Sequence, residues 1–314
     1  MWGDLMKKIL MILLMMLVAF STLTGICQAQ KRFSFKVTGG YGTMSMGDIN
    51  VLQEHLENSY NEWASLSDAS KEGEFKKLNA GFEYEGELTI SLNEHFGIGI
   101  GAGYIQREEA SEVAFELDSG DLYLYYDFSY RPKLSAIPIK LSVYFYLPII
   151  PRMNLFLNGG IGYYFGKLSY RRHWESQQLY EGFEYYELEN KYDIDAKDNG
   201  IGFHGGFGLE YHVKKNLAFF VEGVGRSIKL RAWEGDEIRY TGITFENGKK
   251  EETTTTNSGI LWYYEVYSEI DPGNISYVLK TQEEKPRSSR FVNIRKAEGD
   301  FSGISLRIGF RVKF

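Results

Sequence analysis

Acidic and basic residues occupy alternate positions in several otherwise apolar segments of this sequence, a spacing that gathers them on one face of an extended chain. Carboxylates and cations that share an enclosed space must pair, because an unpaired buried charge is very costly. Such a set either closes a polar interior with salt bridges or forms a narrow, gated path for ions or protons. The residues concerned are Glu85, Glu87, Lys140, Glu210, Glu222, Arg226, Arg307 and Arg311.

The histidines offer the acid–base chemistry that a hydrolase needs. Hydrolysis requires a serine or an activated water beside a histidine and a carboxylate. His204, His212 and Glu210 share one face of an alternating segment, but the local sequence places no serine near His204. We therefore interpret His204 as a hydrogen-bonded interior residue and assign no catalytic residue.

Signals for cofactors and metal ions are weak in the sequence. The run Gly97–Gly103 (GIGIGAG) has the glycine density of a dinucleotide-binding loop, but it alternates like a strand and no helix pattern follows. Its glycines are expected to leave room for bulky neighbours such as Tyr144. The acidic stretches lack the spacing of an EF-hand calcium loop. We assign no cofactor, no cofactor-binding residue and no metal ligand.

The segments that carry the charged residues are predicted β-strands with one apolar and one polar face. The last one alternates most regularly, and its apolar positions are Ile304, Leu306, Ile308, Phe310, Val312 and Phe314. In the segment 217–230 the phase is ambiguous, and we place Glu222 and Arg226 inward. Eight segments follow the pattern, at residues 33–38, 82–92, 98–104, 137–147, 155–165, 203–213, 217–230 and 304–314.

The predicted connections are of two kinds. Tight turns are expected at residues 93–95, 148–152 and 214–216, and long loops at about 44–75, 106–135, 168–199 and 231–299. Short turns at one end and long loops at the other are typical of a transmembrane β-barrel. With an even number of strands, both chain ends are expected at the short-turn end.

The N-terminal residues predict export from the cytoplasm. Lys7 and Lys8 precede an apolar run, 9–20, which is followed by small residues up to Ala29, the pattern of a cleaved signal peptide over residues 1–29. The single cysteine, Cys27, lies within this signal. The formal net charge of −7 argues against a nucleic-acid partner. Residues 30–314 are expected to form one β-barrel domain.

The C-terminal strand resembles the closing strand of bacterial outer-membrane barrels, which alternates and ends on an aromatic residue. Phe310, Val312 and Phe314 carry this resemblance. The mature chain as a whole resembles the outer-membrane β-barrel domain family, of the small OmpA/OmpX-like type. The resemblance implies location in the outer membrane of a Gram-negative-type bacterium. It also implies contact with outer-membrane lipid and lipopolysaccharide, and recognition of the last strand by the outer-membrane assembly machinery.

Two alternatives to an all-β, eight-stranded antiparallel up-and-down barrel remain open. A soluble eight-stranded barrel would carry its charged face outside, but the predicted export signal and the terminal Phe314 favour the membrane. A ten-stranded barrel would include residues 260–268 and 275–280, which flank the turn signal at 271–274. We interpret this pair instead as an extracellular hairpin inside the last loop.

The long loops are acidic and rich in aromatic residues. We interpret these aromatics as parts of strands that extend above the membrane and of the girdle at its interface. The alternative is a recognition surface, because exposed aromatics serve as anchors where a surface binds a ligand. Residues 48–62 are expected to form a short amphipathic helix with Asp48 as its N-cap, and the tract 249–256 (KKEETTTT) is expected to be mobile. The expected function is a structural or surface-interaction role through these loops, with an extracellular ligand and a plugged lumen. The alternatives are a lipid-modifying enzyme of the outer leaflet, although no His-x-Ser-Asn-like deacylase signature is present, and a narrow channel.

Overall fold

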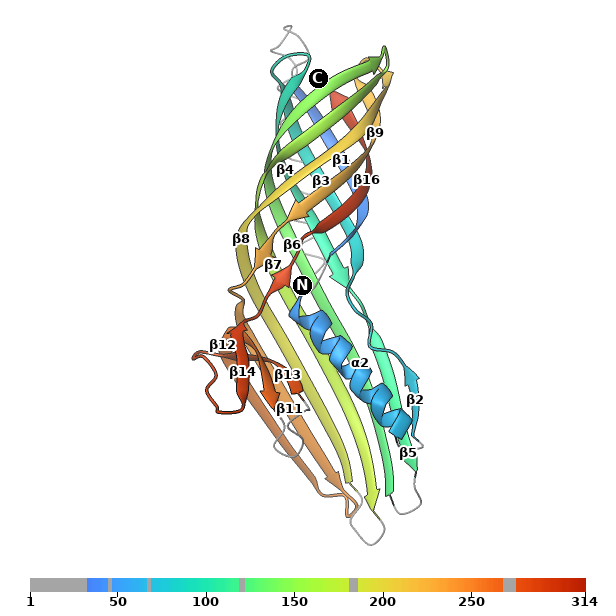
Figure 1. Ribbon diagram of the computed structural model, residues 1–314, viewed down its shortest axis with the longest axis vertical. Helices are drawn as coiled ribbons and strands as arrows, with labels where there is room; N and C mark the ends of the chain where they lie inside the picture. Colours follow the sequence, from blue (N-terminus) through green and yellow to red (C-terminus); the bar gives the residue numbers. More distant parts are fainter. Residues whose placement is uncertain (1–32, 45–46, 67–68, 119–121, 181–185, 268–274) are drawn as a thin grey trace.

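The computed structural model describes residues 33–44, 47–66, 69–118, 122–180, 186–267 and 275–314. Antiparallel ladders close a ring of eight strands in it, each paired with its neighbours on both sides (Figure 1). Around the ring these are β1 (Phe33–Thr43), β3 (Ala80–Ser91), β4 (Phe96–Glu108), β6 (Leu122–Ile150), β7 (Met153–Tyr180), β8 (Tyr186–Lys214), β9 (Leu217–Ser227) and β16 (Gly303–Lys313).

The tight turns predicted from the sequence are confirmed. The connections β3–β4, β6–β7 and β8–β9 span residues 92–95, 151–152 and 215–216. The start of β1 lies at this same end of the ring, because Ser34 pairs with Lys313 of β16. Among the described residues, no helix has both the length and the apolar character needed to cross a membrane.

The expectation of long loops at the opposite end is wrong. Strands β6, β7 and β8 have 29, 28 and 29 residues, so the predicted loops 106–135 and 168–199 are largely strand. A tilted strand needs only about 9–11 residues to cross a membrane. These three strands therefore continue well beyond the ring, and they form the base of a second folded part, which we call the extension (Figure 1).

The extension is one curved sheet continuous with the ring. Its strand order is β13–β12–β11–β8–β7–β6–β5–β2, with β14 paired to β12. The added strands are β2 (Ser70–Gly73), β5 (Ser111–Asp118), β11 (Glu234–Phe245), β12 (Lys250–Tyr267), β13 (Ile275–Gln282) and β14 (Phe291–Lys296). Two short strands, β10 (Lys229–Leu230) and β15 (Gly299–Asp300), pair where the extension meets the ring.

The helix α2 (Asp48–Leu66) contacts both β13 and β2, the two edge strands of the extension. Near its start, the Asp48 carboxylate accepts hydrogen bonds from the Arg295 guanidinium and, at 2.8 Å, from the Glu298 N–H. Further along, Glu57 accepts hydrogen bonds from Lys71 Nζ at 2.7 Å and Phe75 N–H at 2.9 Å. The helix predicted at 48–62 is confirmed, but the Asp48 side chain joins it to the segment after β14 instead of acting as the predicted N-cap.

The two parts of the molecule bury opposite kinds of side chain. In the ring, outward positions of β8 such as Ile201, Phe203 and Phe207 are 63–68% exposed, whereas its inward residues are polar. Further along the same strand, Ile194 and Ala196 face inward and are buried. The same reversal occurs in β6 and β7, so the ring has an apolar outside, and the extension has an apolar inside.

Two further expectations concern the last predicted loop. The prediction that the tract 249–256 is mobile is wrong, because residues 250–256 belong to β12 and pair with β11. Threonine suits strands, which explains the difference. The hairpin within this loop is confirmed as β12 and β13, which pair outside the ring, whereas its turn at 271–274 lies outside the described residues. The predicted signal peptide, 1–29, also lies outside them.

The expected all-β barrel is thus confirmed as a fold class. The expectation of eight strands describes the ring alone, because the described part of the extension and its junction adds eight more strands. The alternation that marks a lipid-facing strand, with an apolar outer face, does not identify these strands. In the extension the apolar face is the inner one, and aromatic and polar residues share it.

Candidate functional site

The interior of the ring is filled by paired charges. Arg307 of β16 lies at the centre: its Nε is 2.5 Å from Glu83 Oε1, and its Nη1 is 3.0 Å from Glu85 Oε2 and 3.7 Å from Glu222 Oε1. Arg226 Nη1 lies 2.5 Å from the second oxygen of Glu83. Among the described residues, five carboxylates and six basic side chains that are at most 9% exposed face this space: Glu83, Glu85, Glu87, Glu210, Glu222, Lys36, Arg107, Lys140, Arg226, Arg307 and Arg311.

The structure brings together all eight residues that the sequence placed in the lumen. Lys140 pairs with Glu85, and Arg311 Nη1 lies 2.5 Å from Glu210 Oε2. Glu87 and Glu222 are joined through a residue outside the predicted set, Lys36, whose Nζ lies 3.8 Å and 2.7 Å from their carboxylates. These side chains are at most 9% exposed, so they leave little room for water.

Three further lumen residues were missed, for different reasons. Lys36 and Glu83 stood on the correct face of their strands but were not included in the set. Arg107 lies 3.9 Å from Glu83 and falls in the predicted loop 106–135, because β4 continues to Glu108, beyond the predicted strand 98–104. Period-two spacing continued through Ile105 and Arg107 could have identified it.

An aromatic cluster lies in the lumen at the short-turn end. Tyr144, Tyr146, Phe156 and Phe220 are buried together, and the Arg311 guanidinium lies 5.2 Å from the centre of the Tyr146 ring. The glycine run of β4 makes space here: a Cβ on Gly99 would collide with the Glu87 carboxylate and approach Tyr144 Cε2 to 3.1 Å. The expected role of these glycines is confirmed at this position.

His204 has the serine neighbour that the sequence did not reveal. Its Nε2 lies 3.1 Å from Ser142 Oγ, which comes from β6, and both side chains are buried in the lumen. His204 Nδ1 is buried and has no hydrogen-bond partner among the described residues. A serine–histidine pair without an orienting acceptor, shielded from solvent, is an incomplete catalytic set. The second inward histidine, His212, lies 3.2 Å from Glu210.

The interior of the extension contrasts with the lumen. A continuous apolar core runs through it, and Trp233 and Phe301 are at most 1% exposed. Tyr60 of α2 packs edge-on against Phe128 of β6, with ring centres 4.9 Å apart, so the helix is part of this core. Partly buried side chains continue the core toward the far end of the sheet: Leu56, Tyr60, Tyr126, Trp174, Tyr192 and Tyr277.

Two arginines enter the interior of the extension, and only one has an acid beside it among the described residues. Arg239 Nε lies 2.6 Å from Glu237 Oε1, and Glu237 also accepts a hydrogen bond from Tyr192 OH at 3.0 Å. Burial and the Glu237 carboxylate together raise the pKa of Tyr192 well above its usual value. Arg239 and Glu237 therefore neutralise each other within the protein.

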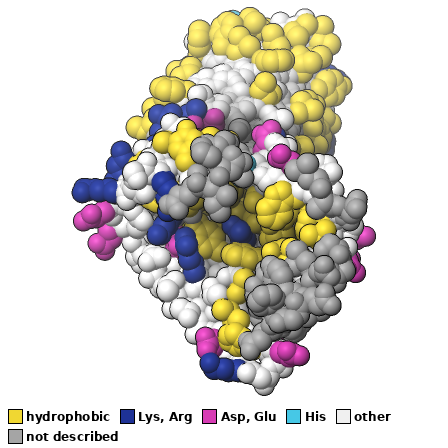
Figure 2. Space-filling model, turned by 60° about the horizontal axis from the view of Figure 1, so that its bottom comes forward, with side chains coloured by type: hydrophobic (Ala, Val, Ile, Leu, Met, Phe, Trp, Pro, Cys, Tyr) yellow, Lys and Arg dark blue, Asp and Glu magenta, His cyan; other side chains and the backbone are white. Residues whose placement is uncertain are grey.

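Arg172 of β7 is the other arginine. Its guanidinium lies 4.3 Å from the centre of the Trp174 ring and 5.5 Å from that of Tyr130, and it forms no ion pair with any described carboxylate. Its Nε is buried without a hydrogen-bond partner among the described residues. Viewed toward the far end of the extension, hydrophobic side chains line a hollow with a basic group among them (Figure 2). Arg172 lies over the rings of Trp174 and Tyr130, and Tyr126 follows Tyr130 on the inner face of β6, so we call these four residues the aromatic hollow.

The residues proposed as an assembly signal lie on the outer face of β16. Phe310 is 39% exposed and Phe314 is 41% exposed, and the Phe314 N–H donates to Phe33 O at 2.8 Å. Val312 pairs with Phe35 of β1. These side chains belong to the apolar belt of the ring.

A closed ring with an apolar outside and a charged inside defines an outer-membrane β-barrel protein. A family model described as "Outer membrane protein beta-barrel domain" matches residues 10–248 of the sequence. The chain belongs to this family and is a protein of the outer membrane.

Solved structures of outer-membrane proteins resemble this one at low identity. OprG from Pseudomonas aeruginosa is 12% identical with a TM-score of 0.33, and the match covers 91% of this chain and 98% of OprG. A major outer membrane protein from Thermus thermophilus is 11% identical with a TM-score of 0.32, covering 90% and 99%. The protease OmpT from Escherichia coli is 10% identical with a TM-score of 0.32, covering 90% and 97%. No curated protein matches the sequence.

Proposed function

We propose that this protein is a closed outer-membrane barrel that binds an anionic extracellular ligand through its extension. The observation that carries the proposal is Arg172, a cation surrounded by aromatic rings without a described acid partner. Arg172 is partly buried, and its charge costs free energy unless it is paired, so a ligand carboxylate, sulfate or phosphate would stabilise it.

The ring faces around Arg172 indicate the remainder of the ligand. Aromatic faces carry partial negative charge and attract the positive C–H edges of a bound molecule. Trp174 and Tyr126 are partly buried against the apolar core. An acidic sugar combines an anion with such C–H edges. The proposed ligand class is therefore an anionic oligosaccharide.

Titration calorimetry with the full chain in detergent tests this function. The probes are an oligosaccharide of uronic acids and a neutral oligosaccharide of equal length. We expect the acidic probe to bind more tightly, and Arg172→Gln to weaken its binding by about tenfold or more, the effect of losing a charged hydrogen bond.

Arg171→Gln is the matched control. Arg171 adjoins Arg172 in β7 but faces outward, where it pairs with Asp195. It should leave binding unchanged. Equal affinity of the two probes, or equal losses in the two arginine variants, would refute the proposal.

The closed lumen is part of the same proposal, and the paired charges and the aromatic cluster support it. Current recordings in planar bilayers test it: the wild-type protein should show no stable openings. Large, stable openings would favour the alternative of a channel.

A second candidate, a lipid-modifying enzyme of the outer leaflet, rests on the hydrogen bond between Ser142 and His204. The missing acceptor at His204 Nδ1 among the described residues and the burial of both side chains make it the weaker candidate. Lipid mass spectra of a deletion strain complemented with wild type or Ser142→Ala separate the two functions. Identical spectra support the binding protein, whereas a lipid species that depends on Ser142 supports the enzyme.

We also propose two contacts in the outer membrane. Lys167 and Lys229 lie just beyond the apolar belt, half-exposed, where phosphates of lipopolysaccharide would meet them. Less lipopolysaccharide should copurify with a Lys167→Gln, Lys229→Gln variant. The assembly machinery is the second partner, and Phe314→Ser should lower the amount of folded barrel in the outer membrane if the closing strand is its signal.

A further inference from the structure

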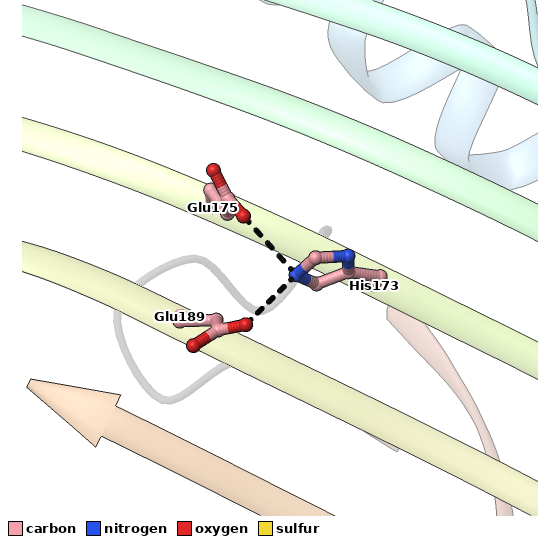
Figure 3. Close-up of side chains that lie close together, drawn as sticks. All are labelled: His173, Glu175 and Glu189. Atoms are coloured by element: carbon pink, nitrogen blue, oxygen red, sulfur yellow. Dashed lines mark ion pairs between the residues drawn. The ribbon is translucent and has the colours of Figure 1, made fainter.

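Three side chains converge on the outer face of the extension, away from the aromatic hollow. His173 and Glu175 belong to β7, and Glu189 lies opposite Glu175 on β8. Both carboxylates point toward the same imidazole nitrogen (Figure 3). His173 Nε2 is 3.4 Å from Glu175 Oε1 and 3.4 Å from Glu189 Oε1.

These distances match a coordination shell. Nitrogen and oxygen ligands about 2.0–2.2 Å from a tetrahedral zinc ion lie roughly 3.3–3.6 Å apart. The three ligand atoms all lie within 4.8 Å of one another. His173 Nε2 is itself buried and makes no hydrogen bond with the described residues, so its lone pair is available when the proton is on Nδ1.

The charges around the cluster also favour a cation. Asp127 of β6 lies opposite Glu175, which lies opposite Glu189, so three carboxylates form a row across adjacent strands. Like charges directly opposite each other destabilise a sheet. Lys191 Nζ, 2.5 Å from Glu189 Oε1, neutralises part of this row and would compete with an ion for that oxygen.

We propose that His173, Glu175 and Glu189 bind one divalent transition-metal ion, and that zinc fits them best. One imidazole nitrogen and two carboxylate oxygens are ligands that such ions accept, and a water would complete a tetrahedron. The ligands come from paired strands, so their positions are set before the ion binds. The ion joins β7 to β8 on the face opposite the aromatic hollow, and this site is independent of the proposed ligand binding.

Zinc titration of the untagged full chain in detergent, followed by calorimetry, tests the site. We expect one ion to bind per chain. His173→Gln, Glu175→Gln and Glu189→Gln should each weaken binding by more than about tenfold, the scale of loss that even outer-shell changes cause. Asp193→Asn is the control, because Asp193 lies on the same face of β8 and pairs with Arg171. It should bind zinc like the wild type.

Lys191→Gln gives the sharper readout, since removal of the competing cation should tighten zinc binding. Cobalt in place of zinc should give the visible spectrum of a tetrahedral site in the wild type and lose it in Glu175→Gln. Gel mobility with and without heating shows that each variant barrel is folded. Folded protein that binds no zinc, or whose zinc affinity is unchanged in the Glu175 and Glu189 variants, would show that the cluster is only a surface ion pair.

Discussion

The ring and the extension share three strands but face opposite solvents. In β6, outward Ile137, Ile139 and Leu141 are 41–50% exposed in the ring, whereas outward Arg131 and Lys133 follow in the extension. The inward side changes from Lys140 and Ser142 to Leu134 and Ala136. Side-chain alternation is unbroken across this change. The backbone of β6 is therefore a regular strand in both parts, and only the face that carries the apolar residues is reversed.

This difference shows what stabilises each part. Lipid covers the ring, so its interior is free to hold charges provided that they are paired. Water surrounds the extension, so burial of apolar area within it must supply the stability. The same substitution should therefore change the stability of the two parts by different amounts, which makes the comparison testable.

The largest effect is expected from Glu83→Gln in the ring. Arg226 and Arg307 both pair with this carboxylate, and breaking a buried pair costs about 3–5 kcal/mol because a charge remains uncompensated. Urea unfolding in lipid vesicles should show a loss at the upper end of this range. Glu112→Gln, at an exposed pair with Arg131, should change stability by less than about 1 kcal/mol. Similar losses for both would contradict the assigned network.

Trp233→Ala should destabilise the extension almost as much as Glu83→Gln destabilises the ring. Trp233 is 1% exposed in the apolar core, and truncation of a buried tryptophan costs about 3–5 kcal/mol. Limited proteolysis should cut the extension while the ring keeps its heat-dependent gel mobility. Loss of the folded ring as well would show that the two parts do not unfold separately.

A matched pair of outward isoleucines compares the two solvents directly. Ile308 is 65% exposed in the belt of the ring, and Ile238 is 46% exposed on the outside of the extension. Ile308→Arg should destabilise the protein by about 2–4 kcal/mol, because arginine is driven into lipid. Ile238→Arg should change it by about 0.5 kcal/mol or less. Equal losses of stability would show that the membrane boundary does not lie between Ile308 and Ile238.

The smallest effect is a dependence of the extension on pH. Partial burial alone would raise the pKa of Glu57, but hydrogen bonds from Lys71 and Phe75 N–H outweigh it, so the pKa is lowered. Glu57 therefore stabilises the extension above its unfolded pKa, about 4.3, and loses this contribution as pH falls through the folded value. Glu57→Gln should be less stable than wild type at pH 7 by less than about 1 kcal/mol. The two proteins should converge as the pH falls below the folded pKa of Glu57, and a constant difference would exclude ionisation as the cause.

The ring could be predicted from the sequence because its pattern is simple. Ile304 to Phe314 alternates without interruption, and the same pattern in seven other segments gave the strands, turns and inward charges. The extension could not be predicted in this way. Leu134, Tyr130 and Phe128 also alternate, but their apolar face is the inner one, and a search for a lipid-facing stripe reads such a segment as a loop.

The candidate sites were predicted unevenly for a related reason. Lumen charges follow from strand alternation alone, which needs only local sequence. Contacts between distant strands do not: Ser142 meets His204 through the register of β6, β7 and β8, and Glu189 meets His173 through that of β7 and β8. Arg172 could not be distinguished from Arg171 without knowing which face of β7 is enclosed.

The reversal of composition within β6, β7 and β8 also acts as a depth marker. A shift of one strand by two residues keeps every side chain on its own face, so alternation alone does not forbid it. Such a shift would carry outward Lys167 or Lys133 into lipid and lift Ile137 or Phe165 into water. The reversal point therefore sets how deep the barrel sits and how its longest strands align, and it holds the extension at a fixed height above the bilayer.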